Sequence, residues 1–102
     1  METTYKTVMM KPQDHVAIAL ENIPQGSKVT VACQDQTFIV ELRDAIDFGH
    51  KFAVRPIANG EDIRKYGEVI GVAIKEVGVG EHVHIHNLDG KRGRGDRLVS
   101  NT

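Results

Sequence analysis

Four glycines occur in the same local setting, and this repetition constrains the fold more than any other feature of the sequence. Each glycine has an apolar residue three positions before it and another three positions after it. Glycine adopts the positive φ angles of tight turns at no steric cost, and the apolar residues on either side return the chain to a core. Because the turns are unevenly spaced, they predict a compact β domain and not a solenoid. They are centred on Gly26, Gly49, Gly60 and Gly80.

Short segments rich in β-branched residues lie between these turns, and several of them alternate apolar and polar residues. No window keeps a helical period for long, although one helical turn is expected around Glu61 to Tyr66, ended by Gly67 and Gly71. The sequence therefore predicts a mainly β fold with at most one or two short helical turns. Strands are expected at 15–20, 27–33, 37–42, 51–57 and 81–86.

The composition is that of an ordinary soluble domain, with 40% hydrophobic residues, 26% charged residues and a formal net charge of −1. This charge gives no reason to expect binding to nucleic acid or to a membrane. A single cysteine, Cys33, cannot form an internal disulfide. The N-terminus lacks the apolar stretch of a secretory signal, so we expect a cytoplasmic protein.

The composition changes near residue 90. We expect one β domain over residues 1–90 and a basic, glycine-rich tail over residues 91–102. Arginine side chains form two parallel hydrogen bonds with carboxylates. Arg92 and Arg94 are therefore candidates for binding an acidic substrate or an acidic partner.

The stretch "GEHVHIHN", residues 80–87, carries three histidines at alternate positions. On a strand, His82, His84 and His86 share one face, and Val83 and Ile85 share the other. The outer two histidines would then lie about 13 Å apart, so the strand alone offers two ligands to one metal ion. The pattern is also compatible with acid–base histidines or with an exposed polar strand.

Other polar residues beside the glycine turns are candidates for a site. His50 and Lys51 follow Gly49, and Lys65 and Tyr66 precede Gly67, where an ammonium and a hydroxyl group could bind an oxyanion. His15, which precedes an apolar segment, is expected at the surface.

The motifs "DHVAIAL", "FGHKFA", "IRKYGEVIG" and "GEHVHIHN", in this order, resemble the N-terminal module of the altronate and galactarate dehydratase family, a member of the SAF-domain group. The resemblance covers residues 6 to 96 and implies a small β-clip fold. It implies an enzyme that removes water from a sugar acid to give a 2-keto-3-deoxy acid and depends on iron(II) or manganese(II). It also implies that the chain is a small subunit that is inactive alone and works with a large catalytic subunit, or else an excised N-terminal module of a longer enzyme.

Carried onto this sequence, the resemblance implies a small set of site residues. Candidates for catalysis are His50, His84 and His86, and candidates for metal binding are His82, His84 and His86. We expect no firmly bound metal on the isolated chain, and a homo-oligomer is possible. The resemblance also makes Lys51, Lys65, Tyr66 and Asn87 candidates for binding the sugar acid. Arg92 and Arg94 of the tail are added to them because arginine pairs with carboxylates.

Two other functions fit the same residues. The chain can be a non-catalytic module that binds an acidic sugar or docks a partner enzyme, with histidines that are merely polar. It can also be the small subunit of a sulfolactate sulfo-lyase, in which sulfite is the leaving group.

Overall fold

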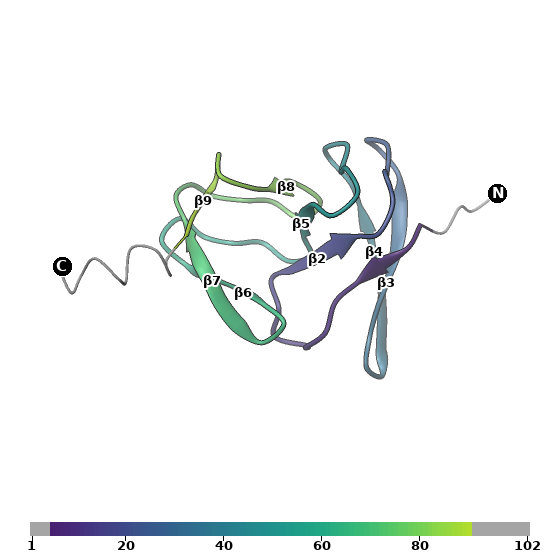
Figure 1. The fold of residues 1–102 in the computed structure, drawn as a ribbon, viewed down its shortest axis with the longest axis horizontal. Coiled ribbons are helices and arrows are strands. Elements are labelled where there is room, and N and C mark those ends of the chain that lie inside the picture. The colour runs from purple at the N-terminus through teal and green to yellow at the C-terminus, as the bar shows by residue number, and fades with distance from the viewer. Residues whose placement is uncertain (1–4, 91–102) are drawn as a thin grey trace.

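The computed structural model describes residues 5–90, and this part of the chain contains strands and turns but no helix. The mainly β prediction is confirmed. Three antiparallel groups make up the fold: a four-stranded sheet in the order β1-β2-β5-β8, the hairpin β3-β4, and a three-stranded sheet in the order β6-β7-β9. Figure 1 shows the hairpin β3-β4 at one end of the molecule and β6, β7 and β9 at the other, with β2, β5 and β8 between them. The strands are β1 Thr7–Val8, β2 Val16–Ala19, β3 Lys28–Cys33, β4 Gln36–Glu41, β5 Lys51–Ala53, β6 Asp62–Lys65, β7 Glu68–Ala73, β8 His82–Val83 and β9 Leu88–Asp89.

The four predicted glycine turns are present, and the fold pairs them two by two. All four glycines have φ between 85° and 90°. In the first pair, Ile23 and Ile46 exchange two backbone hydrogen bonds, which join the turn at Gly26 to the turn at Gly49. In the second pair, Ile57 and Val77 make the same exchange between the turn at Gly60 and the turn at Gly80.

The chain therefore passes twice through the same succession of elements. The first passage runs from β2 through a turn, the hairpin β3-β4 and a second turn into β5. The second passage runs from β5 through a turn, the hairpin β6-β7 and a fourth turn into β8. Because β5 ends one passage and begins the other, it is common to both halves of the domain.

Two apolar cores lie on the two faces of the four-stranded sheet. Phe52 and its cross-strand partner Ala17 belong to the first core, with the hairpin β3-β4. The next residue pair, Ala53 and Val16, belongs to the second core, with β6 and β7. This alternation follows from the pleat of a strand, and it couples the two cores through neighbouring residues of β2 and β5.

Two expectations about local structure are wrong. Residues 62–65 form β6 and not a helical turn, because they pair with β7 in a hairpin that buries Ile63. Gly71 was expected to help end that helical turn, but it lies within the strand β7. A side chain there would overlap the Asp89 carbonyl group, so the glycine lets β9 approach β7.

The predicted strand over residues 81–86 is also shorter than expected. Strand β8 ends at Val83, and a turn follows at residues 84–87. Val83 is buried as expected, but Ile85 is 77% exposed, so it does not share the core face with Val83. The expected basic tail, residues 91–102, lies outside the described residues. Within residues 5–90 there is no helix long and apolar enough to cross a membrane.

Candidate functional site

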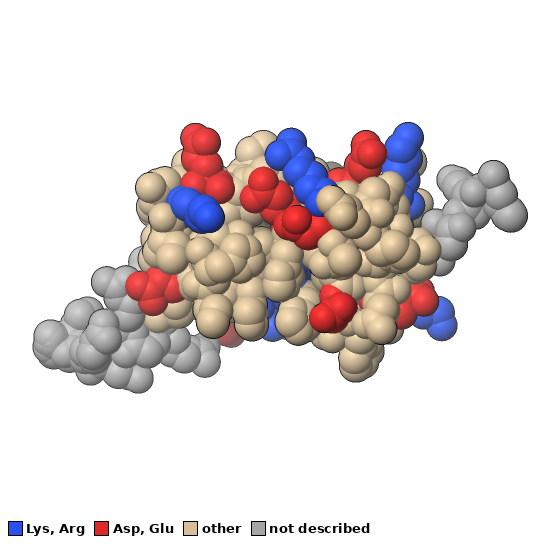
Figure 2. All heavy atoms as spheres, turned by 90° about the horizontal axis from the view of Figure 1, so that it is seen from above, with Lys and Arg blue, Asp and Glu red and all other residues tan. Residues whose placement is uncertain are grey.

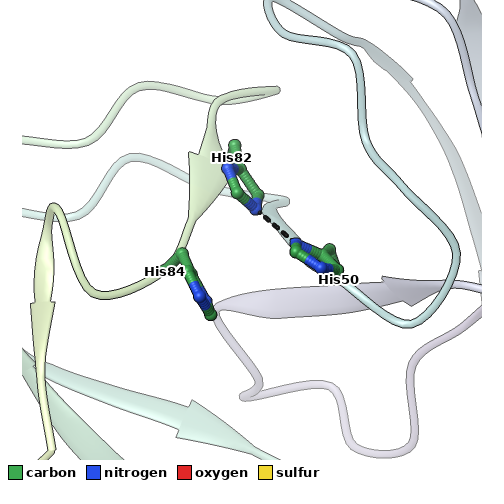
Figure 3. A group of neighbouring side chains, drawn as sticks. All are labelled: His50, His82 and His84. Carbon is green, nitrogen blue, oxygen red and sulfur yellow. Dashed lines mark hydrogen bonds between the residues drawn. The ribbon is translucent and has the colours of Figure 1, made fainter.

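Three histidines converge from two segments of the chain that are far apart in sequence. His50 directly precedes β5, His82 opens β8, and His84 lies in the turn after β8. Antiparallel pairing sets Phe52 opposite His82 and so brings the two segments together. His50 Nδ1 lies 2.9 Å from His82 Nε2, and one nitrogen from each of the three rings lies within 4.8 Å of the others (Figure 3). We call these three residues the histidine cluster.

The cluster differs in one member from the metal-binding set expected from the sequence. The histidine run supplies two of the converging nitrogens, from His82 and His84, and the third comes from His50 and not from His86. His86 stays close, since its ring centroid lies 5.4 Å from that of His82, but it is outside the group of converging nitrogens. His50, which was expected as a catalytic residue, is therefore also a candidate ligand.

Asn87 holds the turn that carries His84. Its side chain is 2% exposed. Its Oδ1 accepts a hydrogen bond from His84 N–H at 2.9 Å, and its Nδ2 donates to His82 O at 2.9 Å. Asn87 was expected to bind substrate, but its amide is engaged with the backbone of the histidine run, and it acts here by positioning His82 and His84.

The surroundings of His82 favour its neutral form. Burial of the ring lowers its pKa, and the neighbouring His50, His86 and His84 lower it further. Asp44 acts in the opposite direction, and its carboxylate accepts a hydrogen bond from His82 N–H at 2.9 Å. Nothing in the sequence pattern singles out Asp44, because its contact with His82 joins residues 38 positions apart in the chain.

The structure brings Lys51 and Lys65 near each other, but not into the histidine cluster. Lys51 pairs with Val83 and so faces the second core, on the opposite side of the sheet from His82. Burial lowers the pKa of Lys51 first, and the charge of Lys65 lowers it further. The Lys65 ammonium lies 5.0 Å from the centre of the Tyr66 ring. Binding of a substrate carboxylate by these three residues stays a prediction.

Two buried residues that were not predicted as functional hold the backbone on either side of Lys65: Asp14 bonds to Tyr66 and Gly67, and His15 bonds to Arg64. Asp14 is fully buried, and its carboxylate accepts hydrogen bonds from Tyr66 N–H and Gly67 N–H at 2.9 and 2.8 Å. These bonds support the positive φ of Tyr66, 57°. His15 is 7% exposed and not a surface residue, because its Nδ1 accepts a hydrogen bond from Arg64 N–H.

A separate hollow lies over the third and fourth turns and is unsuited to an acidic ligand. Its lining includes Glu61, Glu76 and Glu81, with Arg43 as a cationic neighbour. Arg43 is engaged with Glu81, at 3.5 Å between Nη1 and Oε2. Figure 2 shows several carboxylates grouped near the middle of one face, beside a basic side chain. The carboxylates of the hollow would repel a sugar acid, so the histidine cluster is the better candidate for the site. Arg92 and Arg94 lie outside the described residues.

Comparison with known proteins gives the family. The family model described as "Altronate/galactarate dehydratase SAF domain" matches residues 5–91. The chain belongs to the altronate/galactarate dehydratase SAF-domain family. The resemblance expected from its motifs is thereby confirmed.

Two kinds of relative share this SAF domain. One is (2R)-sulfolactate sulfo-lyase subunit alpha of Chromohalobacter salexigens, 40% identical over 77 residues, which are 74% of this chain and 82% of the relative. The same subunit of Paracoccus pantotrophus is 36% identical over 62 residues, 61% of this chain and 92% of the relative. The other kind is the altronate dehydratase of Escherichia coli, 45% identical over 74 residues, which are 72% of this chain but 14% of that enzyme. A domain like this one thus occurs both as a subunit and as a small part of a longer enzyme.

Proposed function

We propose that this chain is the small subunit of a cytoplasmic sugar-acid dehydratase of the altronate dehydratase type and works with a large catalytic subunit. The observation that carries the proposal is the convergence of His50, His82 and His84 at the surface of a domain of this family. His50 and His82 are partly buried and His84 is exposed, so the cluster is accessible from outside. A site of this kind can be completed by a second polypeptide.

The proposed reaction needs groups that histidines can supply. A base removes the proton from the carbon next to the carboxylate, and the resulting electron pair forms a C–C double bond as the hydroxyl group on the next carbon leaves. An acid protonates this hydroxyl group, so that water departs, and the enol product then becomes the 2-keto acid. Imidazole can act as acid or base near neutral pH. His86 is exposed and outside the converging group, so its ring is free to transfer a proton.

A divalent metal ion in the complete enzyme would stabilise the negative charge that develops on the carboxylate as the proton leaves. The donor set of the cluster fits such an ion, because it consists of three imidazole nitrogens within 4.8 Å of one another. His50, His82 and His84 would hold it.

The test exchanges this chain for its counterpart in a working enzyme. In E. coli altronate dehydratase, the segment that matches this chain is replaced by it, and dehydration of altronate is measured. We expect the chimera to be active and the His50→Gln and His86→Gln chimeras to lose at least about 100-fold in kcat. The matched control is Ile39→Ser, a change at a 63% exposed position of β4, which should leave kcat unchanged.

The alternatives give different results in the same design. If the chimera is as active with His50→Gln and His86→Gln as without them, the chain is a binding or docking module and the catalytic proposal is wrong. A second exchange separates the two leaving groups. This chain replaces subunit alpha of the C. salexigens sulfo-lyase, and release of sulfite from (2R)-sulfolactate is measured. Activity there, with none in the altronate chimera, would make the chain a sulfo-lyase subunit.

A further inference from the structure

We propose that His50, His82 and His84 form a binding site for one divalent transition-metal ion within this chain alone. The proposal deepens the proposed function, because it assigns the ligands of the metal to the small subunit. It also departs from the expectation that the isolated chain holds no metal firmly. That expectation counted two ligands from the histidine run, and the fold supplies a third.

The distances fit a metal ion with little rearrangement. Zinc–nitrogen bonds are about 2.0–2.1 Å long, which places two ligand nitrogens about 3.3 Å apart in a tetrahedral site and about 2.9 Å apart in an octahedral site. His50 Nδ1 and His82 Nε2 are already 2.9 Å apart. The nitrogen of His84 lies within 4.8 Å of both, so a small rotation of an exposed ring completes the set. Metal binding replaces the hydrogen bond between the first two rings.

Each ligand is held by contacts that do not involve the other two ligand side chains. The backbone of His50 is fixed by its N–H donating to Asp47 O and by its carbonyl accepting from Ala19 N–H. His82 is paired with Phe52 across the sheet, and its N–H donates to Asp44. These bonds keep two ligands in place before a metal arrives, which reduces the entropy lost on binding.

The turn after β8 prepares the third ligand. His84 N–H is bonded to the Asn87 side chain, while His84 O accepts hydrogen bonds from Asn87 N–H and Leu88 N–H at 3.0 and 2.8 Å. The backbone of His84 is therefore closed into a tight turn, and its ring is directed towards His50, with 5.2 Å between the ring centroids. Asn87 is a positioning residue of the site and not a ligand.

The donor set restricts which metals can bind. Three imidazoles suit zinc, iron, cobalt, nickel and copper, whereas magnesium and calcium prefer oxygen ligands. Cys33 offers no thiolate to the cluster, because it is 2% exposed within the first core. Three protein ligands leave at least one coordination position open, as in catalytic sites. The exposure of His84 places this open position where a substrate carboxylate or a partner residue can reach it.

The direct test is titration of the purified chain, without a histidine tag and freed of metal by EDTA, with Co(II). Visible absorption of bound cobalt reports coordination, and calorimetry with Zn(II) gives the affinity and stoichiometry. We expect one ion per chain, with a Kd in the micromolar range or tighter. His50→Gln and His84→Gln should each weaken binding by more than about 10-fold, while circular dichroism confirms that the variants fold.

His86→Gln is the matched control, because it alters the same histidine run without removing a member of the cluster. It should change the affinity by less than about twofold. The proposal is overturned if the wild-type chain binds neither ion below 1 mM, or if affinity depends on His86 and not on His50. These readouts need no partner and no substrate. Metal binding that persists while the altronate and sulfolactate exchanges both fail would reject the proposed function and leave the metal site standing.

Discussion

At the level of single residues, Glu61 links the third glycine turn to the buried His15. Its carboxylate accepts a hydrogen bond from Ala58 N–H at 2.9 Å and lies 3.2 Å from His15 Nε2. The pKa of Glu61 is lowered mainly by the Ala58 hydrogen bond and secondly by His15. A carboxyl group whose pKa is lower in the folded state stabilises the fold above its unfolded pKa, and this contribution is lost as the pH falls through its folded pKa.

Glu61→Gln should therefore be less stable than the wild type at pH 7, by less than about 1 kcal/mol because the side chain is 43% exposed. The difference should be smaller at pH 3 than at pH 7, because the stabilising charge is lost as the pH falls through the folded-state pKa of Glu61. Urea unfolding at the two pH values, followed by circular dichroism, measures it. An equal difference at both values would mean that the carboxylate charge is not the cause.

The positions of some single residues could not be predicted from the sequence. Strand spacing led us to expect two convergent ligands from the histidine run, and two of its members, His82 and His84, belong to the cluster, although β8 ends at Val83. The third ligand could not be predicted, because the contact between His50 and His82 spans 32 positions and exists only when β5 pairs with β8. The burial of His15 has the same kind of cause, since its partners Glu61 and Arg64 belong to the other half of the domain.

At the level of elements, the four glycine turns share a conformation but not their surroundings. A side chain added at Gly26 would meet nothing within 4 Å, whereas one added at Gly80 would overlap the carbonyl oxygen of Glu41. Both glycines have nearly the same φ, 87° and 89°, so the same substitution at the two positions differs only in the space around the new side chain.

Gly26→Ala should cost about 1 to 2 kcal/mol, the usual penalty of a left-handed backbone for alanine. Gly80→Ala should cost at least about 3 kcal/mol, since the backbone must also move away from Glu41. Urea unfolding of both variants gives the comparison. Equal losses of unfolding free energy in the two variants would show that the close approach of Glu41 to Gly80 adds nothing to the cost of the substitution.

Sequence patterns predicted the elements well where a residue's partners are close in the chain. The strands β3 and β4 and the glycine turns are confirmed, because local alternation and local φ preferences determine them. Strand β7 was missed because Gly71 resembles a helix or strand breaker unless the position of β9 is known. The end of β8 at Val83 was missed because it depends on the two hydrogen bonds that the buried Asn87 side chain makes with the backbone of His82 and His84.

At the level of the whole molecule, the shared strand β5 should make the domain unfold as one unit. Phe52 is fully buried in the first core, and the adjacent Ala53 is fully buried in the second. Phe52→Ala should destabilise the protein by about 3 to 5 kcal/mol. Native-state hydrogen exchange should show this loss in the most protected amides of the hairpin β6-β7 as well, although Phe52 does not belong to their core. Unchanged protection in that hairpin would mean that the halves unfold separately.

The three histidines of the histidine cluster lie in the two-residue strand β8, in the turn after it and directly before β5. None of the three belongs to either apolar core. The residues that we propose as ligands are thus different from those that stabilise the fold by packing. Mutations can alter these proposed ligands without the loss of packing that usually limits the evolution of new activities. A scaffold of this kind can be kept while the reaction changes, which accords with its occurrence in relatives named altronate dehydratase and (2R)-sulfolactate sulfo-lyase.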